Sequence, residues 1–297
     1  MTGRVVCLGD VMVDVLVRLD APLQFGSDTP ADVSWLGGGS AANTACWLAA
    51  DGIEAVFIGR VGADVPGEAS LQALRASGVH AIVTTDVAHP TGTCIVLVDE
   101  HGERTMIPSP GANGALSAAD VDALGFDASD HLHVSGYALF SSARPAALRA
   151  MQVARAAGCT ISLGAASAAP LRAVGAAEFL AWSAGTTLFA NRDEAATLTG
   201  TADVDVAVRA LAAAAGTAVV TSGSAGARWS DGSDVVHVPS VPVAAVVDST
   251  GAGDAFAAGY LAAVLRGGDV HAALRHGGVL AARACEVAGA RPVSDGT

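Results

Sequence analysis

Short apolar segments alternate along this chain with longer segments in which apolar residues recur at helical spacing. The short segments predict strands at residues 4–9, 55–59, 131–135, 160–163, 187–190 and 218–221. The longer segments predict helices at residues 41–51, 66–77, 145–157, 193–199, 205–215, 252–266 and 270–287. Strands that alternate with helices in this order are typical of βαβ units, so we expect an α/β protein with a mostly parallel central sheet.

Two segments interrupt the alternation of strands and helices. Residues 11–20 alternate partly between apolar and polar side chains, and residues 93–107 have the pattern of a hairpin that turns at 100–103. We expect residues of about 12–35 and 91–108 to form a small separate sheet, a lid over the carboxyl edge of the main sheet. Since no linker-like composition divides the chain, residues 1–297 form a single domain in this interpretation.

The composition is apolar for a soluble chain, with 52% hydrophobic residues, 15% charged residues and a mean hydropathy of +0.47. The excess is mostly Ala and Val, and no apolar run approaches the roughly 20 residues of a membrane-spanning helix. The first apolar stretch contains Asp10 and Asp14, which a signal peptide would not. The five cysteines have no paired spacing and are expected to be reduced. These features predict a soluble, cytoplasmic protein without a membrane partner.

The charged residues exclude several classes of function. All 16 basic residues are Arg and the chain contains no Lys, which excludes the P-loop lysine, Schiff-base chemistry and the strand lysine of protein kinases. The net charge of −13, with arginines scattered along the chain, argues against nucleic acid as a partner.

The segment 247–260 (VDSTGAGDAFAAGY) carries the strongest chemical signal. The pattern predicts a strand that ends at Val247. A helix start follows, with Gly251, Gly253 and Asp254. Backbone N–H groups at a helix N-terminus bind anions, and glycines let a phosphate approach the backbone. An Asp there suits a base that accepts the proton of an alcohol attacking a phosphoryl group. The alternative is that Asp254 only complements the helix dipole.

Three further segments carry polar residues that suit ligand binding. Residues 36–45 (LGGGSAANTA) place Asn43 after three glycines, where its amide either binds sugar hydroxyls or caps a helix. Asp14 follows Asp10 by four residues on an extended run, so the two carboxylates share one face and either bind hydroxyls or are solvated. Residues 191–194 (NRDE) follow a strand and either place a hydrated Mg²⁺ or cap the next helix.

Together these segments resemble the ribokinase-like (PfkB) family of carbohydrate and nucleoside kinases. Residues 38–45 (GGSAANTA) are similar to the first family signature, and residues 248–256 (DSTGAGDAF) are similar to the second. Supporting stretches follow in the order of the family, and they lie at 57–62, 91–93, 111–113, 191–194 and 221–223. The resemblance covers residues of about 5–293. It implies a ribokinase-like three-layer αβα sandwich with a mostly parallel central sheet and a small β-sheet lid.

The resemblance also implies an activity and the roles of individual residues. The activity is ATP- and Mg²⁺-dependent phosphorylation of a hydroxymethyl group on a small sugar, as in ribokinases, fructokinases and sugar-acid kinases. The implied catalytic groups are the base Asp254 and the anion-binding amides of Gly251, Ala252 and Gly253. The implied acceptor site consists of Asp14, Gly38, Gly39 and Asn43, and the implied nucleotide site of Asn191, Thr221, Gly223 and Gly226.

The same resemblance implies ions and a partner. Glu194 would help to place Mg²⁺, and Asp248 and Thr250 match positions that hold a monovalent cation such as K⁺ in several members of the family. In some relatives the lids of two subunits pair, so we expect a homodimer formed through the lid.

The chain departs from the family pattern at three places near the expected sugar site. Ser40 replaces a lysine that ribokinases often carry, and Gly-Ala-Ala at 164–166 replaces Asp-x-Asn. Ser135 and Gly136 stand where ribokinases place an acid. Because these changes remove polar contacts to a sugar, they argue against ribose as the acceptor.

The class of acceptor stays open at this point. The arginines that would suit an acidic or phosphorylated sugar, if they are not simply solvated, are Arg18, Arg60 and Arg104. A nucleoside kinase, adenosine-like or pseudouridine-like, is the alternative enzyme, and an aromatic wall for its base would come from Trp35, Phe25 or Tyr137. A non-catalytic sugar-binding protein is a third interpretation, against which the intact segment 251–254 argues.

Overall fold

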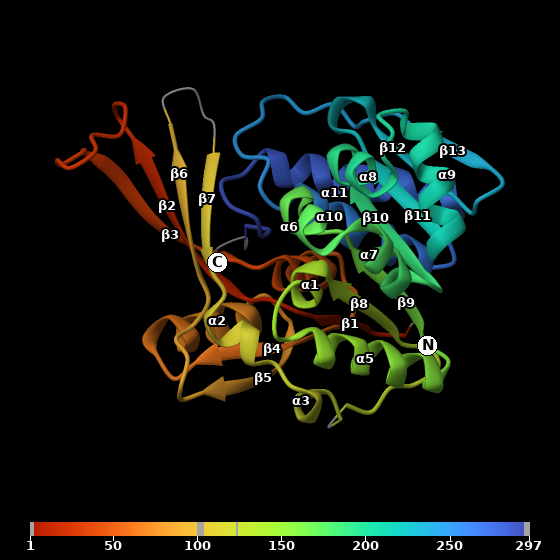
Figure 1. Cartoon of the computed structure of the whole chain (residues 1–297), viewed down its shortest axis with the longest axis horizontal. Coiled ribbons are helices and arrows are strands. Elements are labelled where there is room, and N and C mark those ends of the chain that lie inside the picture. The colour runs from red at the N-terminus through yellow and green to blue at the C-terminus, as the bar shows by residue number, and fades with distance from the viewer. Residues whose placement is uncertain (1–2, 100–103, 123, 294–297) are drawn as a thin grey trace.

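The computed structural model describes residues 3–99, 104–122 and 124–293, and a large central sheet organises them (Figure 1). Its nine described strands lie in the order β13-β12-β11-β10-β9-β8-β1-β4-β5. The parallel strands are β1 (Val5–Leu8), β4 (Ala55–Gly62), β5 (His80–Asp86), β8 (His131–Ser135), β9 (Thr160–Gly164), β10 (Thr186–Asn191) and β11 (Gly216–Thr221). The antiparallel edge consists of β12 (Ala227–Ser230) and β13 (Val235–Val238). The prediction of an α/β protein with a mostly parallel sheet is confirmed.

Helices cover both faces of this sheet. Because successive residues of a strand point to opposite faces, each buried strand contributes side chains to two apolar cores. In β1, Val5 and Cys7 pack in one apolar core, and Val6 and Leu8 pack in the other. The first core is closed by α1 (Ser40–Ala50), α2 (Val65–Ala76), α10 (Ala252–Leu265) and α11 (Val270–Cys285). The second is closed by α3 (Ala118–Asp122), α5 (Arg144–Ala157), α6 (Ala168–Val174), α7 (Ala176–Ser183), α8 (Arg192–Thr199) and α9 (Val204–Ala215). The expected three-layer αβα sandwich is therefore present.

A second sheet forms the lid, and Figure 1 shows it standing out from one side of the main body. It has the order β3-β2-β6-β7 and consists of β2 (Met12–Leu19), β3 (Ala31–Gly38), β6 (Thr93–Val98) and β7 (Arg104–Ser109). The strands thus extend to residues 38 and 109, slightly beyond the predicted segments 12–35 and 91–108. The predicted turn at 100–103 lies outside the described residues.

The register of the lid gives its two faces different roles. Asp14 pairs with Leu36 and Cys94, whereas the next residue, Val15, pairs with Trp35 and Ile95. Asp14 and Cys94 face the main body and line a cavity there. Trp35 and Ile95 lie on the outer face and are 64% and 40% exposed.

One predicted strand is absent. Residues 239–251 form a loop, so the strand expected to end at Val247 is not formed. Pro239 and Pro242 lack the N–H groups that a strand needs. The amides of Val247 and Asp248 instead donate to the carbonyl of Cys285, which anchors the loop to the end of α11.

Two further features of the structure concern helix hydropathy and the cysteines. Within residues 3–99, 104–122 and 124–293, no helix combines the length and the apolarity that crossing a membrane requires. All five cysteines are free, and four of them are buried.

Candidate active site

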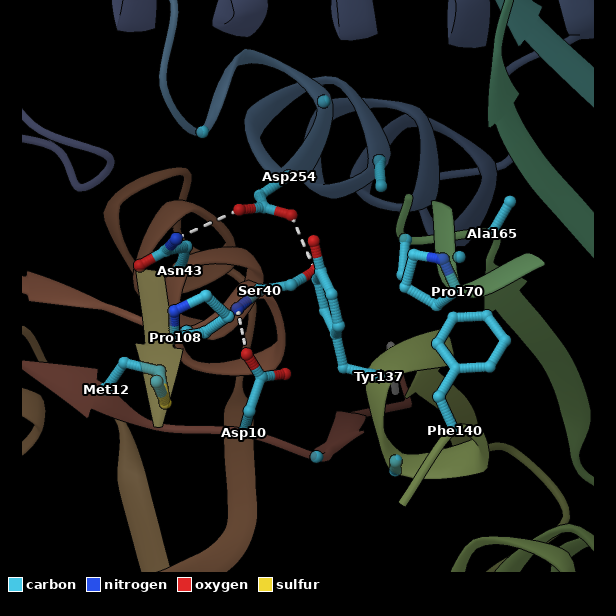
Figure 2. Close-up of a pocket in the computed structure, with 18 of the residues that line it drawn as sticks. Asp10, Met12, Ser40, Asn43, Pro108, Tyr137, Phe140, Ala165, Pro170 and Asp254 are labelled. Atoms are coloured by element: carbon cyan, nitrogen blue, oxygen red, sulfur yellow. Dashed lines mark hydrogen bonds between the residues drawn. The ribbon is translucent and has the colours of Figure 1, made fainter. Parts of the chain in front are cut away.

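Asp254 lies where the first turns of two helices meet. Gly251 precedes α10 with a φ of 76°, and Asp254 falls in the first turn of that helix. Its Oδ1 accepts a hydrogen bond of 2.7 Å from the hydroxyl of Ser40, and its Oδ2 accepts one of 2.9 Å from Nδ2 of Asn43. Both donors belong to the first turn of α1, as Figure 2 shows. The two signature segments, more than 200 residues apart in the sequence, therefore form one site.

The environment of Asp254 places its pKa near neutrality. The pKa of this carboxyl is raised to about 7, mainly by burial and also by the negative charges of Asp10 and Glu194, although the hydrogen bonds from Asn43 and Ser40 lower it. A base with a pKa near the working pH combines a large ionised fraction with a strong affinity for the proton. The carboxylate is thus suited to accept a proton from a hydroxyl group.

A cavity of about 570 Å³ opens beside Asp254, between the lid and the carboxyl ends of the parallel strands. Met12, Asp14 and Pro108 border it from the lid, and Asn191 and Thr221 border it from β10 and β11. Cavities of this size hold small-molecule ligands in other proteins.

Three of the expected acceptor residues, Asp14, Gly39 and Asn43, border the cavity on the side of the lid, whereas Gly38 does not line it. Gly38 lies so close to Asp14 that a Cβ added at Gly38 would overlap the Asp14 carboxylate. Burial raises the pKa of Asp14 to about 6, although the positive charge of Arg291 opposes this effect. Arg291 also donates to the carbonyl of Gly38 at 2.7 Å and to Oδ1 of Asn43 at 3.2 Å. Arg291 therefore organises this group without bordering the cavity itself.

Asp10 is a second carboxylate on the acceptor side. Its Oδ2 accepts a hydrogen bond of 2.9 Å from the amide of Ser40. Its Oδ1 is buried and has no hydrogen-bond partner among the described residues, although Asp10 borders the cavity. A ligand hydroxyl would satisfy this oxygen. Gly39 keeps the two segments close, since its φ is 93° and a Cβ there would lie 2.5 Å from the carbonyl of Asp10.

The N-terminus of α10 is open to a ligand. Gly251 and Gly253 both border the cavity, and Ala252 is the first residue of the helix between them. A Cβ added at Gly253 would meet no protein atom within 4 Å, so the space beside its backbone is free. A Cβ added at Gly251 would lie 2.6 Å from the carbonyl oxygen of Ala290. This helix end has the geometry of an anion-binding site.

Asn191 and Glu194 border the cavity and cap α8 at the same time. Oδ1 of Asn191 accepts a hydrogen bond of 2.9 Å from the amide of Glu194. Oε2 of Glu194 accepts one of 2.9 Å from the amide of Asn191. Burial raises the pKa of Glu194. The two interpretations made from the sequence, a capping pair and a ligand-facing pair, are thus compatible.

The expected nucleotide residues lie at the end of β11. Thr221 is the last residue of that strand and borders the cavity. Gly223 and Gly226 form the turn that follows, with φ values of 55° and 80°, and they are not among the residues that line the cavity. A Cβ added at Gly223 would meet no protein atom within 4 Å, which leaves the turn open to a ligand.

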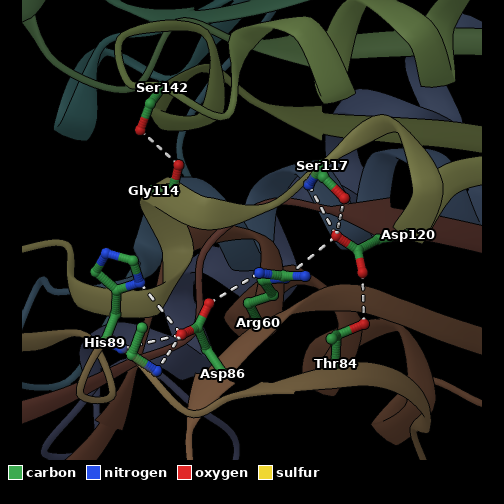
Figure 3. A network of polar contacts seen from close by, with 9 residues as sticks. Arg60, Thr84, Asp86, His89, Gly114, Ser117, Asp120 and Ser142 are labelled. Atoms are coloured by element: carbon green, nitrogen blue, oxygen red, sulfur yellow. Dashed lines mark hydrogen bonds and ion pairs between the residues drawn. The ribbon is translucent and has the colours of Figure 1, made fainter.

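The arginines do not gather at the cavity. Arg60 donates to Asp86 at 2.8 Å and to Asp120 at 3.2 Å, in the network of Figure 3. Arg104 contacts Asp248, and no described arginine is among the residues that line the cavity. Arg18 is exposed on the lid. The cluster that would suit a phosphorylated sugar is therefore not formed, because carboxylates outside the cavity bind two of its three members.

One of the three aromatic candidates borders the cavity. Figure 2 shows Tyr137 beside Phe140 and Pro170, across the cavity from Met12 and Pro108. The other two candidates were wrong. Trp35 is 64% exposed and Phe25 is 93% exposed, and neither lines the cavity.

Three residues of the site were not predicted as site residues. Asp10 was considered with Asp14 as a hydroxyl-binding or solvated carboxylate but was not assigned to the acceptor site, and Ser40 was considered only as a replacement for lysine. Asp10 lies in the same extended run as Asp14, and Ser40 lies in the glycine-rich segment 36–45, so polar residues near these segments were the available signal. Arg291 lies in no such segment, and only the fold brings it to Asn43.

A lid over the open edge of a parallel sheet and an aspartate at a glycine-rich helix start define a class of α/β phosphotransferases. The model of the pfkB family carbohydrate kinases matches residues 2–295. The chain therefore belongs to the PfkB family, and it is a sugar or nucleoside kinase that transfers a phosphoryl group to a hydroxyl acceptor.

Three similar proteins illustrate the range of this family. An ATP-dependent ribose-1-phosphate kinase of Halopiger xanaduensis is 33% identical over 304 residues, which is 98% of this chain and 96% of that protein. The crystal structure of adenosine kinase from Sinorhizobium meliloti has a TM-score of 0.89 at 29% identity and covers 99% of this chain and 97% of that one. A putative ribokinase II from E. coli, solved with ATP and Mg²⁺, has a TM-score of 0.83 at 24% identity, with 97% and 94% covered.

Proposed function

We propose that this kinase transfers the γ-phosphoryl group of ATP to the hydroxymethyl group of a small neutral sugar, with Asp254 as the general base. The observation that carries the proposal is the position of Asp254. Its carboxylate lies at an open helix N-terminus, has a pKa of about 7 and is oriented by Ser40 and Asn43. A carboxylate in that place is adjacent both to the expected phosphate and to the expected alcohol.

The groups of the site divide the reaction among them. Asp254 accepts the proton of the acceptor hydroxyl while the oxygen of that hydroxyl forms a bond to the γ-phosphorus. The bond from that phosphorus to the bridging oxygen breaks, and ADP leaves with the electron pair. The amides of residues 251–253 stabilise the negative charge of the transferred group. Asp10 and Asp14 bind other hydroxyls of the acceptor, and the lid excludes water.

The donor set of the cavity fits a divalent cation. Glu194 is buried beside the cavity, and no lysine exists in the chain to neutralise a polyphosphate. Carboxylate and amide oxygens with several waters are the usual ligands of Mg²⁺. Glu194 and Asn191 would hold the ion, which supplies positive charge to the phosphate oxygens of ATP.

The charges of the cavity favour a neutral acceptor. Four carboxylates border it, from Asp10, Asp14, Glu194 and Asp254, and no described arginine does. A phosphate on the acceptor would meet like charge there, which costs free energy in a site of low dielectric. We therefore do not extend the substrate named for the Halopiger xanaduensis relative to this chain.

A nucleoside is the second candidate acceptor. Tyr137, Phe140 and Pro170 form an apolar wall, and Gly164 and Ala166 stand where the family pattern has the polar residues of Asp-x-Asn. A flat base packs well against aromatic and proline rings. The similarity to an adenosine kinase structure agrees with this alternative.

A panel of acceptors separates these candidates. We would measure ADP release with ribose, fructose, adenosine, pseudouridine and ribose 1-phosphate. Turnover of a neutral compound is expected, and ribose 1-phosphate as the best substrate would contradict the proposal. If a nucleoside is the substrate, Tyr137→Ala should raise its KM and leave the KM of MgATP unchanged. Tight sugar binding without turnover of any compound would favour a non-catalytic protein.

We also infer that a second copy of the chain covers the outer face of the lid. Trp35, Val15, Ile95 and Ile107 form one cross-strand row on that face, and Trp35 and Ile107 are 64% and 51% exposed. Apolar patches of this kind mark interfaces between proteins. Light scattering should give the mass of a dimer, and Trp35→Asp should give the mass of a monomer; a monomeric native protein would contradict the inference.

A cytoplasmic location fits the proposed use of ATP. The five free cysteines agree with a reducing compartment. Fractionation of cells that produce the protein would test this location.

A further inference from the structure

Arg104 connects the lid to the loop before the predicted anion-binding amides. It is the first residue of β7 and lies on the same face of that strand as Met106 and Pro108, which border the cavity. Its Nη2 atom lies 2.7 Å from Oδ1 of Asp248, and its Nη1 atom donates to Oγ1 of Thr250 at 2.8 Å. Arg104 and Thr250 are 146 residues apart in the sequence. The guanidinium therefore joins two elements that only the fold brings together.

Asp248 is the centre of this connection. Its Oδ1 also accepts a hydrogen bond of 2.7 Å from the amide of Thr250, and its Oδ2 accepts one of 3.1 Å from the amide of Gly289. Thr250 directly precedes Gly251, the residue from which α10 starts. A displacement of Arg104 would thus be transmitted through one carboxylate and one hydroxyl to the helix end beside the cavity.

The same atoms leave little room for a monovalent cation. The resemblance places such a cation at Asp248 and Thr250, yet both side chains already bind the guanidinium of Arg104. Burial alone raises the pKa of Asp248, but hydrogen bonds from Thr250 and Gly289 and the charge of Arg104 lower it overall, so the carboxylate is ionised. A buried carboxylate needs a counter-charge, and Arg104 supplies it. The side chains present do not fit the cation site that the family implies.

We propose that Arg104 is a positioning residue that holds the lid against residues 248–250 and replaces the monovalent cation expected there. The inference rests on the proposed role of the amides of residues 251–253 in binding phosphate. Because one guanidinium contacts both the lid and the loop, closure of the lid and the geometry of the anion site are coupled. The kinase then binds its nucleotide without K⁺.

Two substitutions test this role under matched conditions. Arg104→Met removes the charge and the donors but keeps a side chain of similar length. Arg18→Met is the control, because Arg18 lies in the same cross-strand row as Arg104, separated from it only by Val98, and is exposed. Calorimetry would measure the Kd of adenylyl imidodiphosphate with Mg²⁺, in tetramethylammonium buffer with and without KCl.

The native protein and Arg18→Met should bind this analogue with a Kd that KCl changes by less than about twofold. Arg104→Met should bind about tenfold more weakly or worse without KCl, as expected for lost charge-assisted hydrogen bonds. KCl should restore part of that affinity, and Arg104→Lys should keep part of it. The proposal is overturned by a native protein that needs KCl, by full affinity in Arg104→Met or by the absence of any restoration.

Hydrogen exchange gives a second readout that does not depend on turnover. The amides of β7 and of residues 250–253 should exchange faster in Arg104→Met and unchanged in Arg18→Met. If the protection of both segments is the same in all three proteins, Arg104 does not couple them. Failure of this inference is distinguishable from failure of the proposed function, because analogue binding and exchange test Arg104 while only turnover tests Asp254 as the base.

Discussion

The role of Asp254 is best tested by the substitution Asp254→Asn. The amide keeps the size of the side chain and can keep hydrogen bonds to Ser40 and Asn43, which hold the carboxylate at 2.7 and 2.9 Å in the native protein. It cannot accept a proton. Since general-base catalysis contributes about 10²–10⁴-fold, kcat should fall by that factor. The KM of MgATP should stay within about twofold, because the amides of residues 251–253 are unchanged.

The pH dependence follows from the pKa of about 7. The base works in its ionised form, so kcat/KM of the native protein should rise with pH and level off above about pH 7. At pH 6 about a tenth of the carboxyl groups are ionised, and kcat/KM should be lower by about tenfold. The residual activity of Asp254→Asn should lack this dependence.

The same substitution should stabilise the fold at alkaline pH. The folded protein binds the proton of Asp254 more tightly than the unfolded chain does, so the native protein loses stability as the pH rises from about 3.8 to about 7. The full difference corresponds to about 4 kcal/mol, and contact with an open cavity reduces it to about 1–2 kcal/mol. Asp254→Asn should therefore unfold at a Tm about 2–3 °C higher at pH 8 and at an equal Tm near pH 3.

The assay is ADP release at saturating MgATP and acceptor, with thermal unfolding measured on the same samples. Asp193→Asn is the matched control, because Asp193 is also an acid in the first turn of a helix but its side chain is 79% exposed. It should leave kcat, the pH profile and the Tm unchanged. Near-native turnover by Asp254→Asn would show that another group is the base.

Four further substitutions test other contacts of the protein. Gly253→Ala should fold normally, since the added Cβ meets no neighbouring protein atom, but its kcat should fall by about 100-fold because the methyl group occupies the space of the phosphate. Gly251→Ala should instead lower the Tm, because Gly251 has a φ of 76° and the added Cβ would meet the backbone of Ala290. Asp14→Asn should raise the KM of the acceptor by about tenfold and change kcat less, which initial-rate kinetics would show. Arg60→Met should lower the Tm by about 5 °C in calorimetric scans without changing KM, because it removes the guanidinium that pairs with both Asp86 and Asp120 in the network of Figure 3.

The elements that the sequence predicts well are those buried on both faces. Strands such as Val5–Leu8 are continuous apolar runs, because both neighbouring layers of the sheet are helical. The strands at or next to the two edges of the sheet, which are His80–Asp86, Ala227–Ser230 and Val235–Val238, are partly exposed, so their short mixed patterns give no comparable signal. A strand ending at Val247 was predicted because the valines before it are apolar. In the structure these valines belong to a loop, and β13 is the last strand at that edge of the sheet.

In the site, too, the sequence identifies residues that have a local pattern and misplaces residues whose position depends on the tertiary fold. Asp254 and Asn43 lie in glycine-rich segments whose composition indicates a ligand, so the sequence identifies them. Trp35 was one of three candidates for the aromatic wall of a nucleoside site. The side of a strand on which a residue lies depends on its register, however, and a shift of one position exchanges the faces. Asp14 and Leu36 pair on the inner face, and Trp35 is thereby turned outward.

The missing lysine becomes informative once the charges are placed in space. Asp10, Asp14 and Glu194 border the same cavity as Asp254, so the site repels a polyphosphate until something positive is added. The helix end at residues 251–253 supplies partial positive charge, and a divalent cation would supply the rest. Neither source can accept the proton that the acceptor hydroxyl loses. The imidazole of His133 also borders the cavity, but burial lowers its pKa to about 4, which makes it a weak base. We therefore expect a carboxylate to accept the proton, and among the described residues Asp254 combines a pKa of about 7 with a place at that helix end.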